Sequence, residues 1–93
     1  MDVRPRPRTV PTPAYPEELQ SQAVSGWVDF AFTLGADGRV EPASLAVVYA
    51  SHPAFVRPAT EALLAATFAP AQKDGQAVRM RMQQRIRFSV RGR

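Results

Sequence analysis

The chain has 93 residues, which allows one small domain with a single hydrophobic core. With 45% hydrophobic and 22% charged residues and no cysteine, the composition excludes a wholly disordered protein, a disulfide framework and any thiolate-based site. The net charge of +4 favours acidic partners in general, such as nucleic acid, anionic lipid or an acidic protein segment.

Residues 1–12 are expected to form a flexible tail, or the end of a spacer, ahead of one domain over residues 13–91. Proline alternates with arginine and threonine from Arg4 to Pro13. Each proline fixes its own φ, lacks a backbone donor and holds the preceding residue in an extended conformation. This pattern is typical of a polyproline-like segment that stays outside a core.

A short helix and a β-hairpin are expected next. Proline in the first turn, followed by two glutamates, suits the N-terminus of a helix over Pro16–Ala23. From Trp27 to Leu34 the apolar residues alternate with smaller or polar ones, which indicates a strand with one buried face. The sequence Gly-Ala-Asp-Gly at 35–38 predicts a tight turn. The returning strand is expected over Leu45–Ala50, after a wide or bulged connection.

A second helix and a basic strand complete the pattern. Apolar residues four apart, such as Phe55, Ala59 and Leu63, predict a helix in which Pro58 lies in the first turn. After a turn at Asp-Gly, arginines alternate with apolar residues over the final strand, Ala77–Arg91. Every charged residue of that strand is an arginine, so we expect a positive field over one face.

These elements predict an α+β fold, a two-layer sandwich with two helices packed on a three-stranded antiparallel sheet in the order helix, strand, strand, helix, strand. The even-numbered residues of the first and last strands form the apolar face. The other face is expected to be wet and to carry Trp27, Asp29, Thr33 and the arginines. The last strand is expected to lie at an edge of the sheet.

No set of residues predicts an enzyme. The single histidine, His52, precedes a proline at the entry to the second helix, and one histidine without cysteine cannot hold a metal unaided. The acidic residues form no obvious pair for general acid–base catalysis. Gly35 and Gly38 bracket a hairpin turn and do not form a phosphate loop. We therefore expect no catalytic residue, no metal and no cofactor.

Nucleic-acid binding is a further interpretation of the basic face. Trp27 on that face could stack on a base. The other aromatic residues of the strands, Phe30, Phe32 and Phe88, are expected to point into the core, and a stacking sheet needs aromatics on adjacent strands. Nucleic-acid binding therefore stays an alternative, although we expect no nucleic acid among the partners.

Several short motifs follow one another at a distinctive spacing. Tyr15-Pro16 opens the first helix, Gly26-Trp27-Val28 opens the first strand, and Asp37-Gly38-Arg39-Val40 forms its turn. Phe68-Ala69-Pro70-Ala71, an Asp-Gly turn and Ile86-Arg87-Phe88-Ser89 follow in the second half. In this order the motifs resemble those of the TonB C-terminal domain family. Its best-known members carry a glutamine where this chain has Thr12.

The resemblance implies the same α+β fold and a non-enzymatic role. It implies a periplasmic domain that is tethered to the inner membrane in the full-length protein. Such a domain grips the TonB box, a short extended segment of TonB-dependent outer-membrane transporters. It transmits force from proton-driven motor proteins of the inner membrane, which act through the part of the protein that precedes the domain.

An edge strand suits this role because its unpaired N–H and C=O groups can accept an extended peptide. The arginines would keep the edge from pairing wrongly and would attract acidic residues around the partner's box. Two alternatives stay open: a TonB-like interaction or dimerisation module without a transporter, including a homodimer by strand exchange, and a basic nucleic-acid binder. The predicted partner-binding residues are Thr12, Pro13, Tyr15, Pro16, Arg79, Arg81, Gln83, Arg85 and Arg87.

Overall fold

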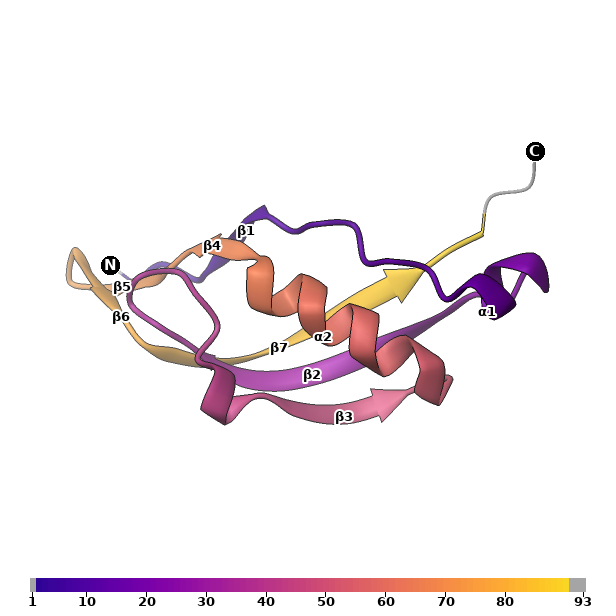
Figure 1. The fold of residues 1–93 in the computed structure, drawn as a ribbon. Coiled ribbons are helices and arrows are strands. Elements are labelled where there is room, and N and C mark those ends of the chain that lie inside the picture. Colours follow the sequence, from indigo (N-terminus) through magenta and orange to yellow (C-terminus); the bar gives the residue numbers. More distant parts are fainter. Residues whose placement is uncertain (1, 91–93) are drawn as a thin grey trace.

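An antiparallel sheet with the strand order β3-β2-β7 forms the centre of the computed structural model, which describes residues 2–90 (Figure 1). The helix α2 crosses one face of this sheet, as the predicted α+β class requires. The predicted end of the domain, Arg91, lies outside the described residues. In chain order the elements are β1 (Arg6–Thr9), α1 (Glu17–Ser21), β2 (Gly26–Leu34), a 3₁₀ helix (Pro42–Ser44), β3 (Ala46–Ala50), a 3₁₀ helix (Pro53–Phe55), α2 (Val56–Ala65), β4 (Thr67–Ala69), β5 (Ala71–Lys73), β6 (Gln76–Val78) and β7 (Met80–Phe88).

The register between β2 and β7 gives the sheet two unlike faces. Val28 lies opposite Ile86 and Phe32 lies opposite Met82 on the face toward α2, which we call the inner face. The other face, which we call the outer face, is the wet one, as the alternation predicts. From β2 and β7 it carries Trp27, Asp29, Ala31, Thr33, Arg81, Gln83, Arg85 and Arg87.

The core lies between the inner face and α2. Phe55 stacks on Phe88 with ring centroids 4.2 Å apart, and both rings are buried. Ala59 and Leu63 of α2 are buried beside them, on the stripe that the sequence predicts. A stacked aromatic pair adds about 0.5–1.5 kcal/mol to the free energy of unfolding beyond its buried area. The end of β7 is therefore fixed to the helix layer by its last aromatic residue.

The helix α1 is shorter than the helix over Pro16–Ala23 that the sequence predicts. The helix α1 ends at Ser21, and Ala23 leaves it with a left-handed φ of 58°. It lies beside one end of the sheet (Figure 1), and its buried residue is Leu19. The helix α2 begins at Val56, so Pro58 does lie in its first turn, where a missing N–H breaks no helical hydrogen bond.

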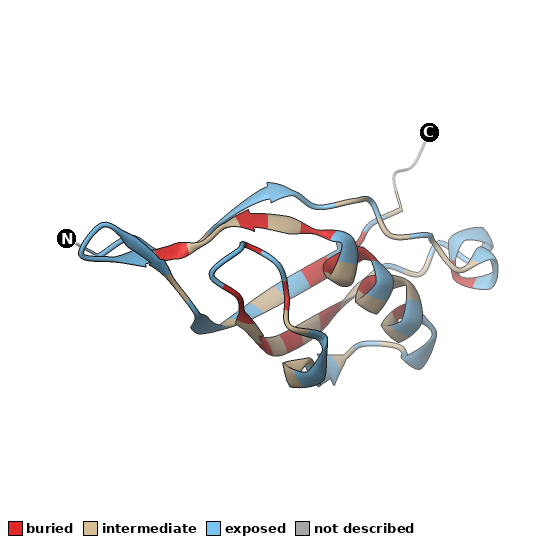
Figure 2. Cartoon of the chain, turned by 60° about the vertical axis from the view of Figure 1, so that its left-hand side comes forward, coloured by how far each residue is buried: buried red, intermediate tan, exposed pale blue. Residues whose placement is uncertain are grey.

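The segment expected as a tail contains a strand. Arg6–Thr9 forms β1 and pairs with β4, and Val3 exchanges two backbone hydrogen bonds of 2.8 and 2.9 Å with Gln72. The residues of β1 are exposed (Figure 2), so main-chain bonds hold this strand and burial contributes little. Alternating prolines suggested an unpaired segment, but an edge strand tolerates proline. The domain boundary between residues 12 and 13 stays a prediction.

The final basic stretch is two strands and not the single strand over Ala77–Arg91 that the sequence suggests. The first part forms β6, which pairs with β5 around a turn at Asp74 and Gly75. The strand β7 begins at Met80, opposite Leu34, the last residue of β2. Residues before Met80 have no partner in the central sheet because β2 has ended. Arg79 lies between β6, which pairs with β5, and β7, which pairs with β2.

The turn after β2 packs closely on β4. The Phe68 N–H donates a hydrogen bond of 2.8 Å to the Gly38 carbonyl oxygen. Gly38 has a φ of +84°, and a Cβ atom there would lie 2.1 Å from the Phe68 carbonyl oxygen. Only glycine satisfies both the backbone conformation and the approach of β4.

We expect Gly38→Ala to lower the free energy of unfolding by about 3 kcal/mol, from its positive φ and from the backbone clash together. Gly75→Ala is the matched control, because Gly75 has a φ of +80° but no atom within 4 Å of the added Cβ. It should cost only about 1 kcal/mol. Urea denaturation of both variants measures the difference, and equal losses would contradict the close approach.

Candidate functional site at the edge of β7

The central sheet has two edge strands, and they differ in length and regularity. The strand β3 has five residues, and Val48 has no partner in its register with β2, which makes a bulge. A bulge twists an edge and hinders further pairing. The strand β7 has nine residues in unbroken register with β2. It is the longer and more regular edge for an added strand.

The hydrogen bonds of β2 reveal which backbone groups of β7 point away from β2. The Trp27 carbonyl accepts from the Ser51 N–H and the Thr33 carbonyl accepts from the Glu41 N–H, both on the β3 side. Odd-numbered residues of β2 therefore face β3, and even-numbered ones bond to β7. The residues of β7 opposite the odd-numbered ones direct their N–H and C=O groups to the open edge. They are Arg81, Gln83, Arg85 and Arg87. One of these groups, the Arg85 carbonyl oxygen, accepts a hydrogen bond of 3.1 Å from Gln84 Nε2.

Asp29 and Arg85 form an ion pair with two hydrogen bonds across β2 and β7. Arg85 Nε donates to Asp29 Oδ1 at 2.8 Å and Nη2 donates to Oδ2 at 3.1 Å. The guanidinium also lies over the Trp27 ring, 4.8 Å from its centroid. The hydrogen bond from Arg85 holds the pKa of the Asp29 carboxyl below its usual value, against desolvation, and the positive charges of Arg85 and Arg87 add to this effect. Arg85 is thus held in one orientation on the outer face.

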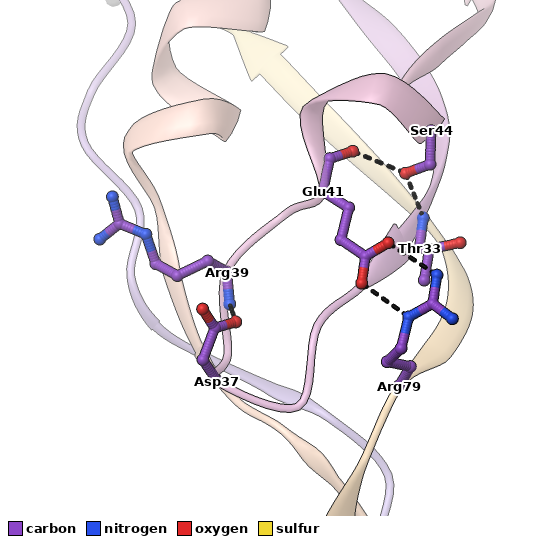
Figure 3. A network of polar contacts seen from close by, with 6 residues as sticks. All are labelled: Thr33, Asp37, Arg39, Glu41, Ser44 and Arg79. Atoms are coloured by element: carbon purple, nitrogen blue, oxygen red, sulfur yellow. Dashed lines mark hydrogen bonds and ion pairs between the residues drawn. The ribbon is translucent and has the colours of Figure 1, made fainter.

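A second ion pair fixes the residue that precedes β7 (Figure 3). Arg79 Nε and Nη2 donate to the two carboxylate oxygens of Glu41 at 2.7 and 2.8 Å. The backbone at Glu41 is itself held, because Ser44 Oγ donates to the Glu41 carbonyl at 2.7 Å and accepts from the Thr33 N–H at 2.8 Å. The hydrogen bond from Arg79 lowers the pKa of the Glu41 carboxyl. This network joins the start of β7 to the connection between β2 and β3.

The two ion pairs reduce the positive field that the sequence suggests. Arg79 and Arg85 are each bound to a carboxylate, whereas Arg81 and Arg87 make no ion pair among residues 2–90. The alternation along the strands predicts that Asp29 lies on the same face as the arginines, but only the structure reveals the register that sets it opposite Arg85. Glu41 was missed because it lies in a connection, 38 residues before its partner.

Tyr15 and Pro16 lie at the end of β7. The Tyr15 ring meets Phe55 and Phe88 edge-on, with centroid distances of 5.8 and 5.5 Å. Its hydroxyl donates a hydrogen bond to the Val24 carbonyl. The Pro16 carbonyl accepts the first backbone bonds of α1. Tyr15 is half-buried and anchors the N-terminal segment to the core beside the last residue of β7.

Thr12 and Pro13 lie over the helix layer. They line a shallow hollow of about 200 Å³ together with Pro58, Glu61 and Ala62 of α2. The structure therefore brings four of the predicted residues together on β7 and sets Tyr15 beside the end of that strand. It places Thr12 and Pro13 against α2.

His52 has a structural role. Its Nδ1 accepts a hydrogen bond of 3.0 Å from the Ala54 N–H and caps the 3₁₀ helix before α2, in line with its predicted place at a helix entry. Among residues 2–90 there is no group of three or more acidic, histidine or cysteine residues that could hold a metal ion. None of the helices in this part of the chain is both long enough and apolar enough to span a membrane.

The two ion pairs make the stability of the domain depend on pH. A carboxyl whose pKa is lowered by folding stabilises the fold above its unfolded pKa, and this contribution is lost as the pH falls through the folded value. We expect the free energy of unfolding to decline between about pH 5 and pH 2. The variant carrying Asp29→Asn and Glu41→Gln should be less stable at neutral pH and should show a smaller decline. Urea denaturation at a series of pH values tests this, and parallel curves for the two proteins would contradict it.

Comparisons with known proteins agree on one relationship. The family model described as "Gram-negative bacterial TonB protein C-terminal" matches residues 11–90. The solution NMR structure of the Pseudomonas aeruginosa TonB CTD is similar to this chain with a TM-score of 0.74, covering 96% of this chain and 89% of that one. At 24% sequence identity this likeness shows the shared fold. No curated protein matches at a significant level. Because the family match spans most of the sequence, the chain belongs to the TonB C-terminal domain family of Gram-negative bacteria.

Proposed function

We propose that this domain binds the TonB box of an outer-membrane transporter by adding it as a strand to β7. Membership of the family implies a role in TonB-dependent transport. The observation that carries the proposal is the open edge of β7, where four alternate residues direct their N–H and C=O groups away from β2. An extended peptide can pair with this row of groups along its whole length.

Main-chain pairing suits a partner whose binding must depend little on its side chains. Each backbone hydrogen bond contributes about 0.5–1.5 kcal/mol net, so a row of them gives a modest affinity that does not depend on one residue. A pull along the strand axis loads these bonds together, and several must break at once. The domain thus acts as a binding module that transmits force, and not as an enzyme.

The ends of β7 are fixed in a way that suits a strand under load. At its start, Arg79 is bound to Glu41 by two hydrogen bonds. At its end, Phe88 is stacked on Phe55 and touched by Tyr15. Between these points β7 is paired with β2 along its whole length. A force applied to a strand docked on β7 is therefore passed to the whole sheet.

The unpaired arginines protect the edge while it is empty. Arg81 and Arg87 make no ion pair in the described part of the chain. Pairing β7 with the same strand of a second copy would bring like charges together, which is unfavourable. In the full-length protein we place this domain in the periplasm, tethered to the inner membrane and driven by its proton-powered motor.

Proline substitutions on β7 separate docking from folding. Gln83→Pro removes an N–H that points to the open edge, and edge strands tolerate proline there. We expect this variant to fold and to bind a TonB-box peptide from a transporter of the same source about tenfold more weakly. Gln84→Pro is the matched control, because the Gln84 N–H faces β2 and its loss should destabilise the fold itself.

The measurement is a backbone amide NMR titration, with urea denaturation to compare the two variants. In the wild-type domain the peptide should shift the amides of Arg81, Gln83, Arg85 and Arg87, and duplex DNA of similar length should not. Unchanged affinity in Gln83→Pro would argue against docking on β7. The absence of any shift with the peptide would remove transporter binding from this isolated domain.

A further inference from the structure

A hollow of about 300 Å³ lies on the outer face, where β2 begins and β7 ends. Its walls include Trp27 from β2 and both Arg85 and Arg87 from β7. Ser25 and Ser89 add hydroxyl groups at its rim. Arg85 and Arg87 also direct their backbone N–H and C=O groups to the open edge of β7, so this hollow adjoins that edge. We call it the Trp27 pocket.

The polar groups of the Trp27 pocket favour an anion. None of its lining residues is acidic, and two of them are arginines. Arg85 uses Nε and Nη2 to bind Asp29, which leaves its Nη1 group without a hydrogen-bond partner among residues 2–90. The guanidinium of Arg87 makes no ion pair in the same range. Both arginines can therefore donate further hydrogen bonds into the pocket.

The charge balance indicates a ligand with one negative charge. Asp29 neutralises Arg85 from outside the pocket, so the two arginines and Asp29 together carry one net positive charge. A single carboxylate would neutralise it, whereas a dianion would leave one negative charge unpaired. A guanidinium and a carboxylate also match in shape, since two parallel hydrogen bonds can form between them.

One wall of the pocket is held in place before any ligand arrives. Arg85 is bound through two hydrogen bonds and lies over the Trp27 ring. The Trp27 ring in turn lies 5.8 Å from the ring of Tyr49 on β3. Trp27 Nε1 is buried and makes no hydrogen bond in the described residues. It lies near enough to Asp29 to help lower the pKa of the Asp29 carboxyl. The indole therefore supplies an apolar wall, and preorganised walls reduce the entropy lost on binding.

A docked strand would present side chains to this pocket. A strand added to β7 lies about 4.8 Å from it, and alternate side chains point to the outer face. Cross-strand neighbours on one face have Cβ atoms about 4.5–5.5 Å apart. A residue beside Arg87 on the docked strand would bring an aspartate or glutamate side chain within reach of the guanidinium groups.

We infer that the Trp27 pocket selects a partner segment with an acidic residue, whose side-chain carboxylate binds Arg87 and the uncommitted N–H groups of Arg85. The inference rests on the proposed function, since docking on β7 delivers that residue. Main-chain pairing alone would bind partner segments of many sequences. The pocket adds the requirement that the partner carries an acidic side chain.

The test is a glutamate scan of the TonB-box peptide. Each outer-facing position of the peptide carries glutamate in one version and glutamine in the other. At one position the glutamate version should bind the wild-type domain about threefold to tenfold more tightly than the glutamine version. It should also shift the indole N–H signal of Trp27, which is unambiguous because the chain has one tryptophan.

Two variants locate the effect. Arg87→Gln should bind the glutamate and glutamine peptides equally. Arg81→Gln is the matched control, because Arg81 lies on the same strand and face and likewise makes no ion pair among residues 2–90, but it does not line the pocket. It should weaken both peptides to a similar degree and keep the preference for glutamate.

The outcomes separate this inference from the proposed function. Peptides that shift the β7 amides but show no preference for glutamate at any position would overturn the pocket and leave strand addition standing. If no peptide binds, the proposal of strand addition is wrong. Titration with sodium acetate, compared with sodium chloride at equal ionic strength, then tests whether the Trp27 pocket binds a carboxylate. An indole shift with acetate that disappears in Arg87→Gln would support a carboxylate site, and no such shift would overturn it.

Discussion

The antiparallel pairing of β2 with β7 determines most other features of this domain. Nine residues of each strand pair without a bulge, from Gly26 with Phe88 to Leu34 with Met80. Because side chains alternate along both strands, this single register sets the inner and outer faces and the partners across them. It also decides which backbone groups of β7 are used by β2 and which stay open. A slip of one residue would turn the arginines toward α2 and close the open groups.

The outer face shows how charge is distributed on a surface that must stay soluble and still bind. Two arginines are bound to carboxylates, Arg79 just before β7 and Arg85 in the second half of β7. Exposed ion pairs of this kind contribute little to stability. Their main effect here is to orient guanidinium groups. In the proposed function, the arginines of β7 that make no ion pair among residues 2–90 keep the edge open by repulsion and attract an acidic partner.

Main-chain pairing without burial holds the N-terminal strand in the structure. The N-terminal strand β1 pairs with β4 although its residues are exposed. Under the proposed function, the edge of β7 forms the same kind of bonding with another chain. Hydrogen bonds between backbones accept many sequences, including one rich in proline. In that proposal specific recognition comes from side chains beside the strand, and we infer that the Trp27 pocket provides it.

The sequence by itself determined the class of fold, the faces of the strands and the motifs that carry the family resemblance. These features are local, since alternation, helical spacing and Asp-Gly turns are read over a few neighbouring residues. Only the tertiary structure decided that Asp29 meets Arg85, that Glu41 meets Arg79 and that β1 pairs with β4. Each of these contacts joins residues distant in the chain, and its partner depends on strand register and on where β2 ends. The strand order places β7 at an edge, as the sequence predicts, and the register decides that its open backbone groups belong to the residues of the outer face.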